Sequence, residues 1–242
     1  MKISSVRLRI PFFYLVFILF SIILGGCQVN AENHIASSAN EALNSEEVSI
    51  QEEELIEKAA KAIDEKEFDA FKYIKSVEST ASGLKNEKQF GAFIAVAQYK
   101  PVLYEVFKSK KTFNIPKYEL DSLISQYSGM EYYTVEIISK SAQNILKTAR
   151  TEISYPEKVT YLAFENQHNF QLQVGKQIKK PAIYHFERGY GLGNSITMIL
   201  AFPNSESKED RVLTYDEKLL GLGKIKFRTT YQNILKNLNE AI

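Results

Sequence analysis

The sequence predicts an α+β fold in which an N-terminal helical subdomain precedes an antiparallel β-sandwich. Two observations indicate this order. Up to Gly129, apolar residues recur at three- and four-residue spacing, which is the period of amphipathic helices. After Gly129, apolar and polar residues alternate, which is the period of strands that bury one face. The change of period places the junction between the two parts near this glycine.

Several short helices are expected, each with one apolar face. Ser49 and Glu52 fit a capping box, in which two side chains bond backbone amides at the helix start. Asn86 is a candidate cap for a later helix, and Pro116 suits the first turn of another. The ranges with a helical period are 49–63, 68–77, 86–97, 102–107 and 116–127, with a closing helix over 231–238.

About seven short strands are expected in the second part. The segments that alternate are 132–137, 159–163, 170–174, 182–186, 196–202, 212–214 and 225–227. Their number and alternation resemble immunoglobulin-like domains, but the chain has no tryptophan and a single cysteine, so it lacks the core residues of that family. We therefore expect an immunoglobulin-like β-sandwich as an architecture only. Residues 139–156 fit either a helix or a strand.

The N-terminal segment has the order of residues typical of an export signal. Lys2, Arg7 and Arg9 precede an apolar run from Ile10 to Leu24, and small residues then lead to Cys27. The run is 15 residues long, whereas a membrane-spanning helix needs about 20. A secretory signal therefore explains the segment better than a transmembrane anchor does.

The motif Leu24-Gly25-Gly26-Cys27 resembles the lipobox of bacterial lipoproteins, with Gly25 where that class more often has Ala, Ser or Thr. The resemblance implies cleavage after Gly26 and acylation of Cys27, palmitate included, so that lipid holds the mature protein on a membrane. Several acyl chains attach a protein stably, because each buried methylene contributes about 0.8 kcal/mol. Gln28 differs from the aspartate that retains such proteins at the inner membrane of enteric bacteria. In a Gram-negative organism this favours the outer membrane, facing the periplasm.

Four parts are thus expected along the chain. They are a signal peptide (1–26), a lipidated N-terminus with a flexible tether (27–46), a helical subdomain (47–129) and a β-sandwich subdomain with a C-terminal helix (130–242). Without the signal peptide, 27 basic and 29 acidic residues remain, a net charge of −2. Nucleic-acid binding needs a clustered basic face, so no nucleic acid is expected as a partner. The expected partners are a membrane, through the lipid, and another protein of the cell envelope.

Two glycine-rich segments are the densest local signals. Residues 187–193 (Glu-Arg-Gly-Tyr-Gly-Leu-Gly) and 217–223 (Glu-Lys-Leu-Leu-Gly-Leu-Gly) share the order acid, base, two residues, Gly-Leu-Gly. A strand is expected after each, whereas a phosphate-binding loop needs a helix there. They are interpreted either as hairpin loops or as a joint binding rim. The residues of this candidate rim are His185, Glu187, Arg188, Gly191, Gly193, Glu217, Lys218, Gly221 and Gly223.

His185 and Glu187 share one face of a predicted strand, because side chains alternate along a strand. The pair would suit an envelope hydrolase if a third polar group converged on it in a pocket. A carrier with a cavity for a small apolar ligand is a second alternative. No metal or cofactor motif occurs in the sequence, so no cofactor and no catalytic residue are assigned. The leading hypothesis is a lipid-anchored envelope protein that acts as a non-enzymatic binding or structural module.

Overall fold

The computed structural model describes residues 57–58, 61–62, 68–110, 115–141, 144–149, 152–187, 193–205 and 207–239. These ranges contain six α-helices and nine antiparallel strands, which confirms the α+β class. The expected signal peptide, the tether and most of the helix expected over 49–63 lie outside the described residues.

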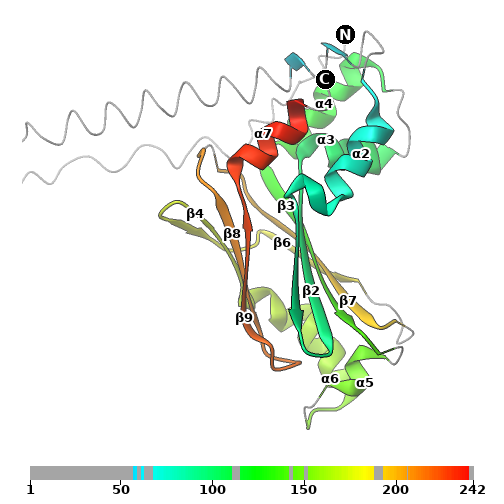
Figure 1. Ribbon diagram of the computed structural model, residues 1–242, viewed down its shortest axis with the longest axis vertical. Coiled ribbons are helices and arrows are strands. Elements are labelled where there is room, and N and C mark those ends of the chain that lie inside the picture. Colours follow the sequence, from blue (N-terminus) through cyan, green and yellow to red (C-terminus); the bar gives the residue numbers. More distant parts are fainter. Residues whose placement is uncertain are drawn as a thin grey trace, which may run out of the picture. The chain divides into compact units, whose positions relative to one another are not determined.

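Two antiparallel sheets form the centre of the fold (Figure 1). The five-stranded sheet has the order β1-β2-β3-β7-β6, with strands β1 (Lys85–Phe90), β2 (Phe93–Lys100), β3 (Met130–Ser139), β7 (Ser195–Pro203) and β6 (Ile183–Glu187). The four-stranded sheet has the order β5-β4-β8-β9, with strands β5 (Gln177–Lys179), β4 (Phe170–Val174), β8 (Arg211–Glu217) and β9 (Gly223–Thr229).

Both sheets contribute buried apolar side chains to a shared hydrophobic core. In β3 the buried and half-buried positions alternate over all ten residues. Val135 lies opposite Ala97 on one side and Met198 on the other. From the other sheet, Phe170 and Tyr215 enter the same core with ring centroids 4.2 Å apart and planes nearly parallel. The two inward faces therefore stabilise each other by burying apolar surface.

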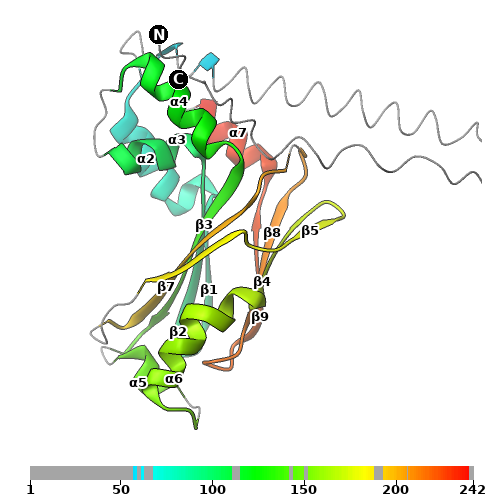
Figure 2. The ribbon, with the colours of Figure 1, turned by 180° about the vertical axis from the view of Figure 1, so that it is seen from behind.

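The helices lie at the two ends of the sheets (Figures 1 and 2). At one end are α2 (Ala70–Glu78), the short 3₁₀ turn η2 (Thr80–Ser82), α3 (Val102–Lys110), α4 (Lys117–Tyr127) and α7 (Tyr231–Asn239). At the other end are α5 (Ile145–Thr148), α6 (Tyr155–Thr160), the π-helical turn η3 (Tyr161–Glu165) and the 3₁₀ turn η4 (Asn166–Asn169). The helices expected over 68–77, 102–107, 116–127 and 231–238 are confirmed.

The helix expected over 86–97 is wrong, because these residues form the hairpin of β1 and β2. The apolar run from Phe93 to Tyr99 fits both periods, but the buried side chains that join the hydrophobic core are those of Ala95, Ala97 and Tyr99, at a spacing of two. Gly91, with a φ of +55°, allows the tight turn between the strands. The five-stranded sheet therefore joins β1 and β2, which precede Gly129, to strands that follow it.

The strand expected over 159–163 is also wrong, because these residues belong to α6 and η3. A capping box starts this helix: the backbone N–H of Ser154 donates to Oε2 of Glu157 at 2.7 Å. Local capping thus outweighs the alternation of Val159 and Tyr161. The structure also adds β5, which the sequence pattern does not predict. The other six expected strands are confirmed.

Candidate functional site

The first half of the candidate rim lies on β6, an edge strand of the five-stranded sheet. His185 and Glu187 are exposed on one face and Phe186 between them is buried, as the alternation predicts. Arg188 and Gly191 lie outside the described residues. Gly193 is described and lies two residues before the start of β7. Next to it, the carbonyl of Asn194 accepts a hydrogen bond of 2.7 Å from the amide of Ser139.

The exposed position of His185 and Glu187 bears on their chemistry. His185 lies opposite Ile199 of β7, and Glu187 lies opposite Thr197, so the pair faces outward from the sheet. A general acid or base needs a substrate held close to it and a partner that orients it. Both side chains are instead open to solvent on a strand face. Among the described residues, no three His, Cys, Asp or Glu side chains group to hold a metal ion.

The second half of the rim is the hairpin loop between β8 and β9, and its acid is buried. Glu217 is 2% exposed, and its carboxylate accepts hydrogen bonds from the amides of Leu219 (2.8 Å), Leu220 (2.9 and 3.0 Å) and Leu222 (3.0 Å). Burial raises the pKa of Glu217, and the amide donors oppose this rise. The loop amides that would hold an external anion are therefore occupied by the chain's own carboxylate.

The remaining residues of this loop fit the hairpin interpretation. Gly221 and Gly223 have φ angles of +74° and +69°, a region that glycine adopts without strain. Lys218 is exposed, with its Nζ 3.8 Å from a carboxylate oxygen of Asp216. The structure thus gathers Glu217, Lys218, Gly221 and Gly223 in one loop. His185 and Glu187 belong to the other sheet. One of the two similar segments therefore lies between two strands of the five-stranded sheet, and the other lies between two strands of the four-stranded sheet.

A buried ion pair connects the two sheets. The Glu131 side chain on β3 is 1% exposed and the Arg211 side chain on β8 is 3% exposed, with Arg211 Nε 3.3 Å from Glu131 Oε2. Arg211 also donates to the carbonyls of Ser205 (3.3 Å), Ser207 (2.8 Å) and Glu209 (2.7 Å). The sequence does contain a signal for this pair. Along each strand, the charged residue is an even number of positions away from buried apolar residues, so its side chain points to the same, inward face.

A second buried polar cluster surrounds Asn166, which starts the 3₁₀ turn η4 and is fully buried. Its amide nitrogen donates to the hydroxyl of Tyr184 at 3.1 Å, and its carbonyl oxygen accepts from the hydroxyl of Tyr215 at 3.2 Å. Tyr184 in turn donates to the carbonyl of Leu162 at 2.6 Å. Burial raises the pKa of Tyr184 to about 12, so its hydroxyl stays protonated. These groups satisfy one another, which indicates a structural role.

The chain matches no protein-family model, no curated protein and no solved structure at a significant level. In the part of the chain that the structure describes, no helix has the length and apolar composition needed to span a bilayer.

Proposed function

We propose that the protein is a lipid-anchored cell-envelope protein whose folded body is a non-enzymatic binding or structural module. The observation that carries this proposal is the position of Cys27, the single cysteine of the chain, directly behind an apolar run and the residues Leu24-Gly25-Gly26. A lone cysteine cannot form an internal disulfide. In the lipoprotein class, a cysteine in this place is the site of acylation.

The proposed location is the outer membrane, facing the periplasm, if the organism is Gram-negative. The lipid makes the membrane contact, so the folded body is free to meet another component of the envelope. Residues 28–46 behave in this proposal as a tether with a typical reach of roughly 25 Å. The body would then work close to the membrane surface.

The finer architecture belongs to the same proposal, namely an immunoglobulin-like β-sandwich that serves as a rigid platform. Two antiparallel sheets with one shared core support it. The ion pair of Glu131 and Arg211 supports it further, because it fixes one sheet against the other. A rigid platform binds a protein partner at a lower entropic cost than a flexible one does.

The partner surface that we propose includes the exposed face of β6. His185 and Glu187 point outward there, next to Ile183, whose side chain is 51% exposed. An exposed apolar side chain beside two exposed polar side chains suits contact with a protein surface. The same exposure suits catalysis poorly, since a reaction site must exclude water and orient its substrate.

Replacement of Cys27 by Ser tests the anchor. We expect the variant to lose labelling by radioactive palmitate and to leave the membrane fraction, whereas the matched variant Gln28→Ser keeps both. If Cys27→Ser stays in the membrane fraction and takes up as much label as the native protein, the anchor proposal is wrong.

Crosslinking in intact cells tests the binding module. The native protein should recover a specific envelope protein, and the double variant His185→Ala, Glu187→Ala should recover less of it. These exposed substitutions are expected to change the free energy of unfolding by no more than about 0.5 kcal/mol. Repeated recovery of no specific protein would count against a binding module.

A further inference from the structure

The strand β6 lies at an edge of the five-stranded sheet, and no described strand pairs with its outer side. It pairs with β7 alone, from Ile183 opposite Ala201 to Glu187 opposite Thr197. In an antiparallel pair, alternate residues direct their N–H and C=O groups to the neighbouring strand, and the others direct them away. About two or three residues of β6 therefore offer both backbone groups on the outer side.

The other three edge strands of the described sheets carry basic side chains. These are Lys85 and Lys88 in β1, Lys179 in β5, and Lys224, Lys226 and Arg228 in β9. The strand β5 is also only three residues long, and β1 and β9 lie against each other. Proteins use lysines, short strands and covering elements to prevent a foreign strand from pairing with an edge. These three edges are therefore protected.

The strand β6 lacks this protection. Its sequence, Ile183-Tyr184-His185-Phe186-Glu187, contains neither lysine nor arginine, and its one acid is the last residue. Isoleucine, tyrosine and phenylalanine are among the residues that strands favour most. The Ile183 side chain is 51% exposed, so an apolar group is also available beside the edge. An edge with these properties is a template for the addition of another strand.

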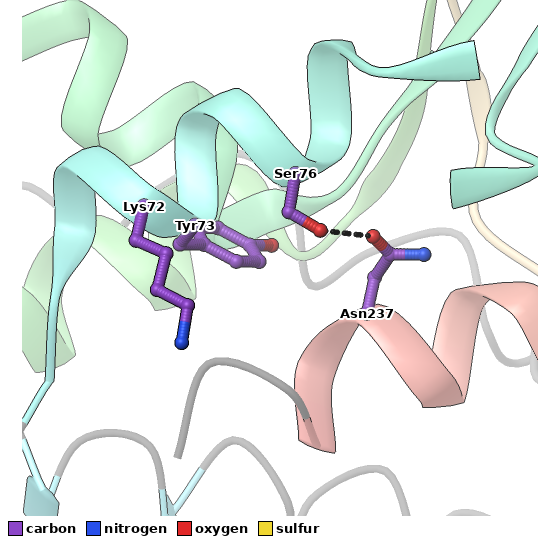
Figure 3. A pocket seen from close by; sticks show the side chains of 4 residues that line it. All are labelled: Lys72, Tyr73, Ser76 and Asn237. Carbon is purple, nitrogen blue, oxygen red and sulfur yellow. Dashed lines mark hydrogen bonds between the residues drawn. The ribbon is translucent and has the colours of Figure 1, made fainter. Parts of the chain in front are cut away.

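The side chains of Ser76 and Asn237, drawn in Figure 3, are instead bonded within the chain. The Ser76 hydroxyl on α2 donates to the side-chain oxygen of Asn237 on α7 at 3.2 Å. The amide nitrogen of Asn237 donates to the carbonyls of Ser82 (3.1 Å) and Asn233 (2.8 Å). Both polar atoms of this amide are thus used inside the fold, which indicates a structural role. The hollow that these residues line therefore gives less reason to expect a partner than the edge of β6 does.

We propose that β6 binds an extended segment of the envelope partner, which adds to the five-stranded sheet as a further antiparallel strand. This direction matches every strand pairing in the two described sheets. The inference rests on the proposed function, because it specifies how the binding module holds its partner. Main-chain hydrogen bonds supply the affinity of such a contact, and side-chain pairs supply its specificity.

The side chains of β6 define the residues that suit the added segment. An antiparallel segment runs from Glu187 back to Ile183, and residues directly opposite each other interact. A basic residue suits the position opposite Glu187, and an apolar residue suits the position opposite Ile183. Tyr184 and Phe186 face the core, so β-branched apolar residues suit the positions opposite them. The preferred segment thus begins with a basic residue and ends with an apolar one.

Titration of the full-length lipidated protein in detergent with the capped peptide Lys-Val-Thr-Val-Ile tests the proposal. Saturable binding is expected by ligand-observed NMR. Ile183→Lys should weaken this binding about tenfold, because it places a protective lysine on the edge. The matched variant Ile178→Lys, at a position 62% exposed on edge strand β5, should bind the peptide as the native protein does. Both replaced side chains are largely exposed, so both variants should melt close to the native temperature.

Two N-methylated forms of the peptide distinguish strand addition from contact through side chains alone. One is methylated at the backbone nitrogens of its valines, and the other at those of its remaining residues. Each therefore lacks the N–H donors of one edge. Only one edge of an added strand meets β6, so one form should lose binding and the other should keep it.

Three results would overturn strand addition: no saturable binding of the unmethylated peptide, binding of both methylated forms or of neither, and equal binding by Ile183→Lys and Ile178→Lys. Crosslinking in intact cells tests the proposed function without any peptide. A specific envelope protein recovered there, together with one of these three results, would leave the binding module in place and remove strand addition alone.

Discussion

Two buried carboxylates, Glu131 and Glu217, are each 2% exposed but are stabilised in opposite ways. Glu131 pairs with Arg211, which is 80 residues further along the chain and on the other sheet. Glu217 is bound by backbone amides that lie two to five residues after it. The first arrangement holds two sheets together, and the second holds only its own hairpin loop.

This difference determines what each carboxylate does for the molecule. Removal of Glu131 leaves a guanidinium in the core that water cannot reach. Removal of Glu217 leaves amides in a loop where Leu220 and Leu222 are partly exposed, so water can replace the carboxylate. We infer that the long-range pair contributes to the stability of the whole body, whereas the local contacts define the shape of one loop.

The largest effect is expected for Glu131→Gln. This change leaves the charge of Arg211 buried without its counter-ion, which should lower the free energy of unfolding by about 3–5 kcal/mol. Urea denaturation followed by circular dichroism measures the loss. The matched control is Glu136→Gln on the outward face of the same strand, where a change of no more than about 0.5 kcal/mol is expected.

The double variant Glu131→Leu, Arg211→Met sharpens this result. Because it removes both charges, it should be more stable than Glu131→Gln alone. Breaking a buried ion pair is expected to cost several kcal/mol. A loss below about 1 kcal/mol for Glu131→Gln would therefore contradict the inference that Glu131 stabilises the whole body while Glu217 stabilises only its loop.

Two glycines extend the contrast between long-range and local contacts. Gly83 and Gly221 both have positive φ angles, of +70° and +74°. A Cβ at Gly83 would collide with the side-chain amide of Asn233 on α7, whereas at Gly221 it would meet no atom within 4 Å. Gly83→Ala should therefore cost about 2–4 kcal/mol and Gly221→Ala about 1–2 kcal/mol. Equal losses in thermal unfolding would show that the packing of α7 on Gly83 is unimportant.

Glu217→Ala should have a moderate effect. Three loop amides lose their acceptor, and water replaces it only in part, so a loss of about 1–3 kcal/mol is expected. Hydrogen exchange should show faster exchange at Leu219, Leu220 and Leu222 and native rates in β3. The control Lys218→Ala should change neither quantity. Faster exchange in β3 as well would mean that this loop also supports the sheets.

The smallest effect is a dependence on pH. The folded pKa of Glu217 is raised, so between the unfolded value of about 4.3 and the folded value the folded state binds more protons than the unfolded state. The contribution of Glu217 to stability should thus be most favourable below pH 4.3 and fall as the pH rises through this window. The stability difference between the native protein and Glu217→Gln should follow this course in urea titrations. A difference that grows in favour of Glu217 with rising pH would show that the amide donors dominate over burial.

The sequence predicts those parts of the fold in which one period dominates. In β3 the alternation of Tyr133, Val135 and Ile137 does not fit the period of a helix, and the predicted strand is confirmed. The run from Phe93 to Tyr99 fits both periods, and pairing with β3 decides it in favour of a strand. Pairing between distant segments is not visible in a local pattern, so the predicted helix there is wrong.

The candidate sites show the same limit. The repeated Gly-Leu-Gly order correctly marks the β8–β9 hairpin, because positive φ angles at Gly221 and Gly223 are a local requirement. The inward position of Glu217 in that loop depends on the fold of the loop amides around it. The ion pair of Glu131 and Arg211 joins residues that are 80 positions apart in the chain. No spacing rule connects residues at such a distance.

The mass of the N-terminal peptide of the protein extracted from membranes tests the central claim most directly. We expect a peptide that begins at Cys27 and carries the added mass of acyl chains, palmitate included. A peptide that retains residues from 1–26, or one that begins at Cys27 without acyl groups, would contradict it.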